Sequence, residues 1–256
     1  MLKILSWNVN GIRAAHKKGF LAWLSKESPD ILCLQEIKVL PAQLPPELLT
    51  LPGYHVYWNS AVRLGYSGVA VFTKTKPLAV KQGLGVPRFD EEGRVLELEF
   101  KTFTILGIYF PNGGMSEERL KFKLDFYEEL LRYLLKLKKA GKKLIVAGDY
   151  NTAHHPIDLK NPEENETVSG FMPVERAWLD KLVSKGFLDT FRLFNPKPDQ
   201  YTWWDMRTRA RERNAGWRID YHFISSDLKP ILKDAFIMPE VTGSDHCPVG
   251  IVLDIG

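Results

Sequence analysis

Eight short apolar runs constrain the fold of this chain more than any other feature of its sequence. Each has five to seven residues rich in Ile, Val, Leu or aromatic side chains, and many are bounded by Gly, Pro, Asn or Asp, as buried β-strands are. The expected strands cover residues 3–7, 31–35, 68–73, 95–100, 103–109, 144–148, 219–224 and 249–254. Helical patterns lie between them, so the order of elements predicts a layered α/β protein.

Three segments carry helix signals. The longest begins after Ser116, a good N-cap, repeats apolar residues at spacings of three and four, and ends before Gly141. This apolar stripe is expected to be buried, whereas the lysines of the same helix alternate with acids and are expected to be solvated. Further helices are expected over residues 173–185, before Gly186, and over residues 20–26, before Pro29.

The composition is that of an ordinary globular protein. Of 256 residues, 45% are hydrophobic and 26% charged, which excludes disordered, collagen-like and coiled-coil chains. Cys33 and Cys247 are too few for a disulfide framework, and no CxxC pair indicates zinc. The first residues have too short an apolar stretch for a signal peptide, so we expect none, and no apolar run approaches the roughly 18–20 residues that span a bilayer. We therefore expect a cytoplasmic protein without membrane contact; its net charge of +4 identifies no partner.

Acids and amides follow several of the expected strands. Asn, Asp and Gly commonly end strands, and each such residue alone could be a turn former. Together they form a set, because loops at one edge of a sheet are where α/β proteins place their chemistry. Converging carboxylates repel each other, and a hard divalent cation such as Mg²⁺ or Mn²⁺ offsets that repulsion. The residues of this set are Asn8, Glu36, Tyr109, Asp149, Asn151, Asp220, Asp245 and His246.

Ten ordered motifs carry a family resemblance. They are WNVNGIRA, LCLQEIK, GYSGVAVFTK, IYFPNG, VAGDYNTAH, SGFMPVERAWLD, DTFR, YTWW, GWRIDY and GSDHCPVG. In this order they resemble the exonuclease III-type apurinic/apyrimidinic endonucleases of the endonuclease/exonuclease/phosphatase superfamily, from about residue 2 to residue 252. The resemblance implies a DNase I-like fold, which is a four-layer α/β sandwich of two packed mixed β-sheets flanked by helices. It also implies that residues 1–256 form a single domain, and we expect a monomer.

The resemblance assigns roles to the polar set. It makes Glu36 the principal ligand of a Mg²⁺ ion, with Asn8 and Asp245 at the same site. It places Asp149 and Asn151 at a further metal or phosphate site and Tyr109 in contact with the phosphate. It pairs His246 with Asp220, which orients the histidine ring. Asp149 is the expected base that orients or deprotonates the attacking water, and His246 is the alternative base.

A basic segment and an apolar pocket are the expected DNA contacts. Arg207 and Arg209 belong to the alternating arginines of RTRARER, beside two tryptophans, a composition that suits phosphate contacts and stacking. Arg13 and Tyr66 are further candidates on loops at the same edge. By the resemblance, Asn112 falls on a family asparagine, and three residues fall on the wall of a pocket for a flipped abasic sugar: Trp203, Trp217 and Ile219.

The resemblance therefore implies a hydrolase that repairs double-stranded DNA. The expected reaction is Mg²⁺-dependent cleavage of the backbone 5′ of abasic sites, leaving a 3′-hydroxyl and a 5′-deoxyribose phosphate. A 3′→5′ exonuclease or 3′-end-cleaning activity, or incision beside damaged bases or uracil, could accompany it. Two alternatives remain open at this stage: a phosphatase of the same superfamily acting on phosphoinositides, and a DNA-binding module without catalysis.

Overall fold

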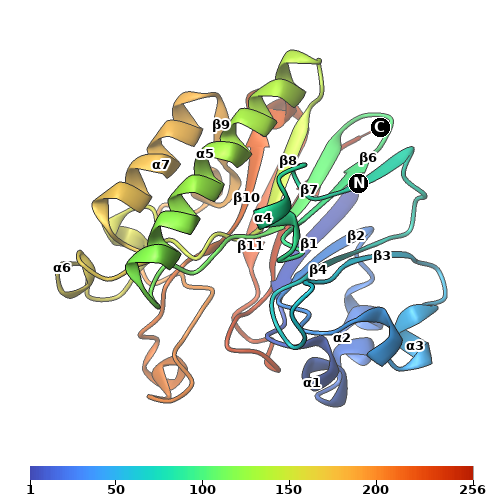
Figure 1. The fold of residues 1–256 in the computed structure, drawn as a ribbon, viewed down its shortest axis with the longest axis horizontal. Coiled ribbons are helices and arrows are strands. Elements are labelled where there is room, and N and C mark those ends of the chain that lie inside the picture. The colour runs from blue at the N-terminus through green and yellow to red at the C-terminus, as the bar shows by residue number, and fades with distance from the viewer. Residues whose placement is uncertain (256) are drawn as a thin grey trace.

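Two six-stranded β-sheets form the centre of the computed structural model, which describes residues 1–255 (Figure 1). The first sheet has the strand order β11 (Leu232–Ile237), β12 (Val249–Leu253), β1 (Leu2–Asn8), β2 (Ile31–Gln35), β4 (Val69–Thr73) and β3 (His55–Asn59). The second has the order β5 (Ala79–Gln82), β6 (Val95–Glu99), β7 (Thr104–Tyr109), β8 (Leu144–Asp149), β10 (Asp220–Ser225) and β9 (Phe187–Asp189). Each sheet is mixed, because β1–β2 and β7–β8 are parallel and the other neighbours are antiparallel.

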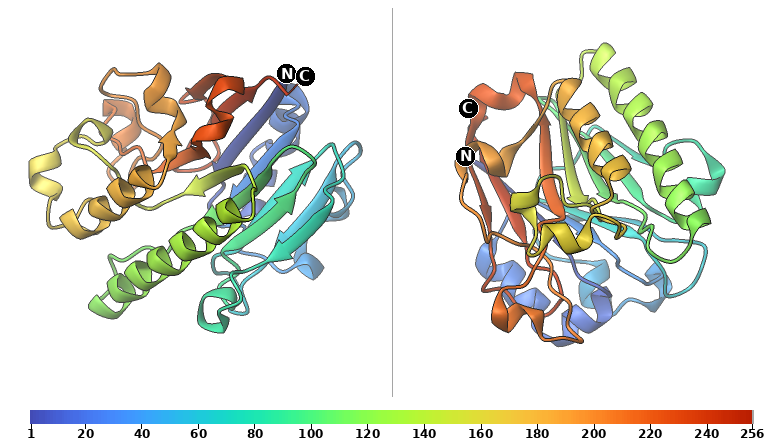
Figure 2. Two further views of the ribbon diagram at one scale, coloured as in Figure 1. Left: turned by 90° about the horizontal axis from the view of Figure 1, so that it is seen from above. Right: turned by 90° about the vertical axis from the view of Figure 1, so that its left-hand side faces the viewer.

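Helices cover the outer faces of the two sheets (Figures 1 and 2). The helices α1 (Ile12–Lys17) and α2 (Phe20–Glu27) pack on the first sheet, and α5 (Glu117–Lys139) and α7 (Pro173–Ser184) pack on the second. The four-layer sandwich is therefore confirmed. Shorter helical segments lie in the connections: η1 (Pro41–Gln43), α3 (Pro46–Leu49), α4 (Pro87–Asp90), η2 (Pro156–Asp158), α6 (Pro162–Asn165), α8 (Thr190–Phe194), η3 (Ala210–Arg213) and η4 (Ser226–Ile231).

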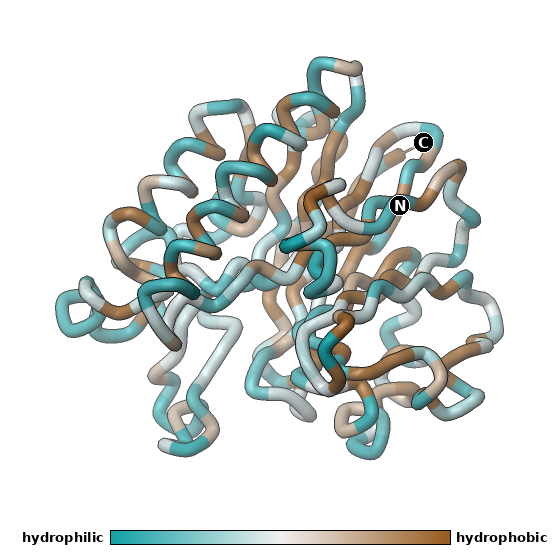
Figure 3. Tube along the Cα trace, in the orientation of Figure 1, coloured by the Kyte–Doolittle hydropathy of each residue, from teal (hydrophilic) through white to brown (hydrophobic). Residues whose placement is uncertain are grey.

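Three apolar cores hold these layers together. The central core lies between the sheets, where Ile4 and Val71 of the first sheet pack in one cluster with Ile145 of the second. The two outer cores join each sheet to its helices, and include Phe20 on α2 and Trp178 on α7. Hydrophobic residues accordingly follow the strands and the inner sides of the helices, while hydrophilic residues line the outer helix faces (Figure 3). Among the described residues, no helix has the length and apolarity needed to cross a membrane.

The eight expected strands are all present, with boundaries shifted by at most one residue, and so are the three expected helices. The sequence analysis missed four strands, β3, β5, β9 and β11, together with α1 and the short helices. These four are the edge strands of the two sheets. An edge strand has a neighbour on only one side and can stay exposed. All four residues of β5 are exposed, so the sequence of β5 lacks the apolar run that marked the interior strands.

Candidate active site

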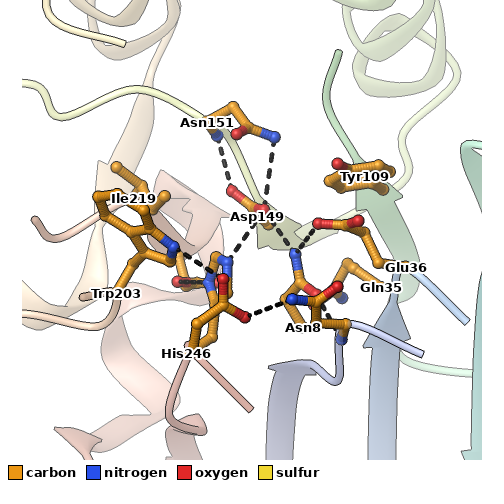
Figure 4. Close-up of polar contacts among 12 residues, drawn as sticks. Asn8, Gln35, Glu36, Tyr109, Asp149, Asn151, Trp203, Ile219 and His246 are labelled. Carbon is orange, nitrogen blue, oxygen red and sulfur yellow. Dashed lines mark hydrogen bonds and ion pairs between the residues drawn. The ribbon is translucent and has the colours of Figure 1, made fainter. Parts of the chain in front are cut away.

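Two carboxylates and one amide meet where the ends of the two sheets face each other (Figure 4). Glu36 directly follows β2 of the first sheet, and Asp149 is the last residue of β8 in the second. Asn8, the last residue of β1, donates through Nδ2 to Glu36 Oε1 at 2.9 Å and to Asp149 Oδ2 at 2.8 Å. The Asn8 amide therefore connects the two sheets at this point, because its nitrogen donates to an acid from each sheet.

A histidine–aspartate pair makes a second connection between the sheets. His246, in the segment before β12, lies with Nδ1 2.9 Å from Oδ2 of Asp220, the first residue of β10, and with Nε2 3.9 Å from Asp149 Oδ2. Thr202 donates its hydroxyl to the same Asp220 oxygen at 2.6 Å. Burial alone would lower the pKa of His246, but Asp220 and the other nearby carboxylates raise that pKa to about 10. His246 is therefore a cation at neutral pH, and both ring nitrogens are donors.

The environment of Asp149 favours its protonated form more than that of an ordinary aspartate. Its side chain is buried, and burial together with the neighbouring Asp220 carboxylate raises the pKa of Asp149 against the opposing effect of His246. The Asn151 backbone N–H donates to Asp149 Oδ1 at 2.7 Å, which fixes the plane of the carboxylate. A carboxylate with a raised pKa in a cavity is suited to accept a proton.

Lys38, which the sequence analysis did not single out, lies beside Glu36. Its Nζ is 2.7 Å from Glu36 Oε2. Burial would raise the pKa of Glu36, but Lys38, Asn8 and His246 together lower it, so Glu36 is ionised at neutral pH. Glu36 (φ 51°), Lys38 (φ 52°) and Asn151 (φ 50°) have left-handed backbones, which non-glycine residues adopt at a cost of order 1–3 kcal/mol. The surrounding structure therefore holds these residues in place.

The acidic cluster fits a hard divalent cation. Ligand atoms of Glu36, Asp149 and His246 lie within 4.8 Å of one another. Because His246 is a cation, the carboxylates of Glu36 and Asp149 are the donors of this set, and oxygen donors suit Mg²⁺ or Mn²⁺. Asp245 borders the same cavity, but its oxygens are bonded to side chains: Oδ2 accepts from Trp203 Nε1 at 3.1 Å and Oδ1 from Asn10 Nδ2 at 2.9 Å.

A cavity of about 310 Å³ opens beside the acidic cluster. One wall is apolar, with the rings of Trp203 and Trp217 perpendicular to each other at a centroid distance of 6.3 Å. The opposite side is polar and includes Tyr109, whose pKa is raised well above its usual value by burial and by the Glu36 carboxylate, so that its phenol remains a donor. The cavity is lined by Glu36, Tyr109, Asn112, Asn151, Val168, Ser169, Gly170, Trp203, Trp217, Ile219, Asp245 and His246.

Most of the expected DNA contacts lie near this cavity, and some lie outside it. Asn112 donates to Asn151 Oδ1 at 3.2 Å. Arg207 and Arg209 belong to the loop between α8 and β10, which projects from the sandwich (Figure 1). Arg207 is highly exposed, and Arg209 lies in a surface depression with Asp245, which also lines the cavity. Arg13 is on the exposed side of α1. Tyr66 lies outside the cavity, and its hydroxyl accepts from Arg94 Nη2 at 3.0 Å and from Arg119 Nη2 at 3.1 Å.

Two arginines make structural contacts: Arg211, which belongs to the segment expected to contact phosphate, and Arg94, which the sequence analysis did not weigh. Arg211 of the RTRARER segment donates through Nη2 to the carbonyl oxygens of Pro239 (2.6 Å) and Val241 (2.7 Å), so it holds the loop rather than extending into solvent. Arg94 is fully buried behind Tyr109, donates to its carbonyl oxygen at 2.9 Å and lies 4.7 Å from its ring centroid. These contacts join segments distant in sequence, and no local motif signals them.

The fold and the site together define a class of protein, which is a phosphodiester hydrolase built on a two-sheet sandwich. Residues 5–246 match the endonuclease/exonuclease/phosphatase family, and the chain belongs to that family. It is 46% identical to an exodeoxyribonuclease of Bacillus subtilis over 99% of this chain and 100% of the relative, and 44% identical to the DNA repair nuclease APEX1 of Danio rerio over 99% and 83%. An AP endonuclease from Archaeoglobus fulgidus has a TM-score of 0.90 at 32% identity, with both chains covered completely.

These relatives favour the DNA-repair branch of the family over the phosphoinositide phosphatases. The chain is an exonuclease III-like nuclease of the hydrolase class, and its function belongs to DNA repair of the exodeoxyribonuclease and AP endonuclease kind.

Proposed function

We propose that this protein is a Mg²⁺-dependent phosphodiesterase that cleaves DNA 5′ of abasic sites and leaves a 3′-hydroxyl and a 5′-deoxyribose phosphate. The observation that carries the proposal is one cavity lined both by Glu36, a member of the Glu36–Asn8–Asp149 cluster, and by the apolar wall of Trp203 and Trp217. The first group suits a phosphodiester and the second an uncharged sugar without a base. The names of the relatives agree with such a substrate.

In this reaction the donors of the cavity hold the phosphate. Tyr109, Asn151 and the His246 cation would donate to phosphoryl oxygens, whose negative charge grows in the transition state. Glu36, with Asn8 and Asp245 beside it, would hold Mg²⁺, which supplies charge neutralisation at the phosphate and at the leaving 3′-oxygen, and Mn²⁺ could replace it. A further metal or phosphate position lies at Asp149 and Asn151.

Asp149 is the better candidate for the base. The raised pKa of His246 favours its protonated form at neutral pH. A protonated histidine has no free lone pair with which to accept the proton of the attacking water. The Asp149 carboxylate can orient the water and accept its proton. Asp220 then serves to keep His246 a cation and fix its ring, rather than to relay a proton.

The cavity explains a preference for a missing base. An abasic nucleotide costs little to extrude, because no base has to be unstacked. Trp203, Trp217 and Ile219 would contact the extruded sugar, and Asn112, Arg13, Tyr66, Arg207 and Arg209 would contact the flanking DNA. A terminal 3′ nucleotide or a nucleotide beside a damaged base or uracil could reach the same site, which would give 3′→5′ exonuclease, 3′-end-cleaning and damage-incision activities.

The test is cleavage of an end-labelled duplex with one abasic site, with analysis of the end groups. We expect incision on the 5′ side in Mg²⁺ and none in excess EDTA. Asp149→Asn should lower the rate about 10²–10⁴-fold while DNA binding persists, and Glu36→Gln should raise the Mg²⁺ concentration needed. Glu166→Gln, an exposed acid on another segment, is the matched control and should have no effect. Undiminished incision in EDTA, or cleavage on the 3′ side, would refute the proposal.

A further inference from the structure

A fully buried ion pair lies beneath the loop that carries Asn151. Lys123 on α5 and Glu175 on α7 have side chains with 0% exposure, and Lys123 Nζ is 2.7 Å or less from two oxygens: 2.6 Å from Glu175 Oε1 and 2.7 Å from the Asn151 carbonyl. The prediction that the lysines of this helix are solvated is therefore wrong for Lys123. Its position faces the second sheet, where the neighbouring carboxylate and carbonyl replace water.

Glu175 is bonded to the wall of the cavity. Its Oε2 accepts from the backbone N–H of Gly170 at 2.6 Å and of Met172 at 3.1 Å, and its Oε1 accepts from the Ser169 hydroxyl at 2.9 Å. Ser169 and Gly170 line the cavity. The pair therefore connects two segments: Lys123 binds Asn151 in the loop after β8, and Glu175 binds residues 169–172 at the cavity wall.

Stability alone is a poor explanation for this pair. Removing two charges from water costs several kcal/mol per ion, and replacing a buried pair by apolar residues is often neutral or stabilising. The pair does provide a strong donor to the carbonyl of a residue in a left-handed backbone conformation. That residue, Asn151, also carries the amide at the cavity and the N–H that fixes Asp149.

We propose that Lys123 and Glu175 are positioning residues for the cleavage reaction, which hold the Asn151 amide at the cavity through the hydrogen bond from Lys123 to the Asn151 carbonyl. The inference rests on the proposed function in one respect, which is that the Asn151 amide donates to a phosphoryl oxygen of the DNA. Both residues are fully buried and neither lines the cavity, so their loss should slow the chemical step and leave DNA binding nearly unchanged.

The experiment measures kcat and KM on the abasic duplex for Lys123→Met, Glu175→Gln and the double variant, after chemical unfolding has shown which are folded. The double variant removes both charges and avoids a single uncompensated ion. We expect its kcat to fall about 10–100-fold and its KM to change less than about threefold, because a small displacement of a reacting group has effects of this size. Glu175→Gln should lose less, because it retains the bond from Lys123 to Asn151.

A second ion pair between the same two helices is the matched control. Lys181 on α7 lies 2.6 Å from Glu128 on α5, and both side chains are about half exposed. Lys181→Met with Glu128→Gln removes the same charges between the same elements and should leave kcat unchanged. If the buried double variant does not fold, Lys123→Gln, a shorter neutral donor, provides the comparison.

Combination with Asn151→Ala separates positioning from general disturbance. If the pair acts through Asn151, then replacing Lys123 and Glu175 in the Asn151→Ala protein should lower kcat by less than about threefold. An unchanged kcat in the parent background, or an equal loss in both backgrounds, would overturn the inference. The unsubstituted protein tests the proposed function separately. If it leaves the abasic duplex intact, the same kcat ratios are measured on 3′→5′ digestion of a nicked duplex.

Discussion

Asp158 offers a quantitative test of how the cavity wall is supported. Its side chain is fully buried in η2, and its Oδ1 accepts from Arg218 Nε at 2.8 Å and from Arg192 Nε at 3.0 Å. Arg218 lies between Trp217 and Ile219 of the wall, and its backbone N–H donates to the Asp158 carbonyl at 2.6 Å. The perturbation is Asp158→Asn, which keeps the shape of the side chain and removes its charge.

The expected cost follows from the pKa of Asp158. Burial alone would raise this pKa, but Arg218 and Arg192 lower it from 3.8 to about 2. The difference corresponds to about 2 kcal/mol at neutral pH, at about 1.36 kcal/mol per pKa unit. Because the pKa is lower in the folded state, this contribution is complete well above pH 3.8 and is lost as the pH falls through 2. Asp158→Asn should therefore lower the free energy of unfolding by about 2–4 kcal/mol at pH 7, because Arg192 and Arg218 both lose a buried charged partner, although Arg218 keeps its pair with Asp189 at 2.7 Å.

Denaturant unfolding of the parent and the variant at pH 7 and pH 3 measures this effect. By pH 3 the cost of Asp158→Asn should shrink by roughly 1 kcal/mol, because part of the carboxylate is protonated in the unfolded parent. Asp254→Asn, in a surface pair with Lys233 at 3.8 Å, is the control, and should cost less than about 1 kcal/mol at both pH values. An equal cost of Asp158→Asn at pH 7 and pH 3 would refute the argument.

Three further predictions concern catalysis, DNA binding and the stability of the arginine-rich loop. Asp220→Asn removes the carboxylate that most raises the pKa of His246. The activity of the variant should therefore fall with rising pH at a lower pH than the activity of the parent does. A rate that instead increases with rising pH would make His246 the base. Replacing Arg207 and Arg209 by Ala should weaken DNA binding and reduce the slope of log K against log salt by about 1–2. A salt slope that is unchanged by the replacement of Arg207 and Arg209 would make these two arginines ordinary surface residues. Arg211→Ala should instead lower the melting temperature, because Arg211 loses its hydrogen bonds to the carbonyl oxygens of Pro239 and Val241.

The interior of the fold could be predicted from sequence, and its margins could not. Interior strands such as β2 and β8 are buried at every residue, so their sequences are continuous apolar runs. Each edge strand pairs with one neighbour only. Among them, β3 (HVYWN) does carry strand-favouring residues that the sequence analysis passed over, whereas β5 and β11 (LKDAFI) are interrupted by charged or polar side chains. The sequence of β5, AVKQ, does not differ from a loop by any local measure.

The site divides in the same way. Asn8, Glu36 and Asp149 could be identified because they follow strands, where parallel neighbours place their ends together. Lys38 and Lys123 could not, because a lysine in a sequence is normally a solvated surface residue. Their roles depend on what folding places beside them: a glutamate for Lys38, and a glutamate and a carbonyl for Lys123. Lys123 shows this limit most clearly, because its partners Asn151 and Glu175 lie 28 and 52 residues away in sequence, whereas Glu36 lies only two residues before Lys38.

The division of the site between the two sheets has a consequence for evolution and engineering. Asn8 and Glu36 come from the first sheet and Asp149 and Asp220 from the second, so the reacting groups are aligned only while the apolar core between the sheets keeps its spacing. Cleavage rate is then a sensitive gauge of inter-sheet packing. A volume change at Val71 or Ile145, both fully buried between the sheets, should therefore lower turnover by more than its cost in stability alone would explain. A change of equal volume in either helix-covered outer core should lower stability with a smaller loss of turnover.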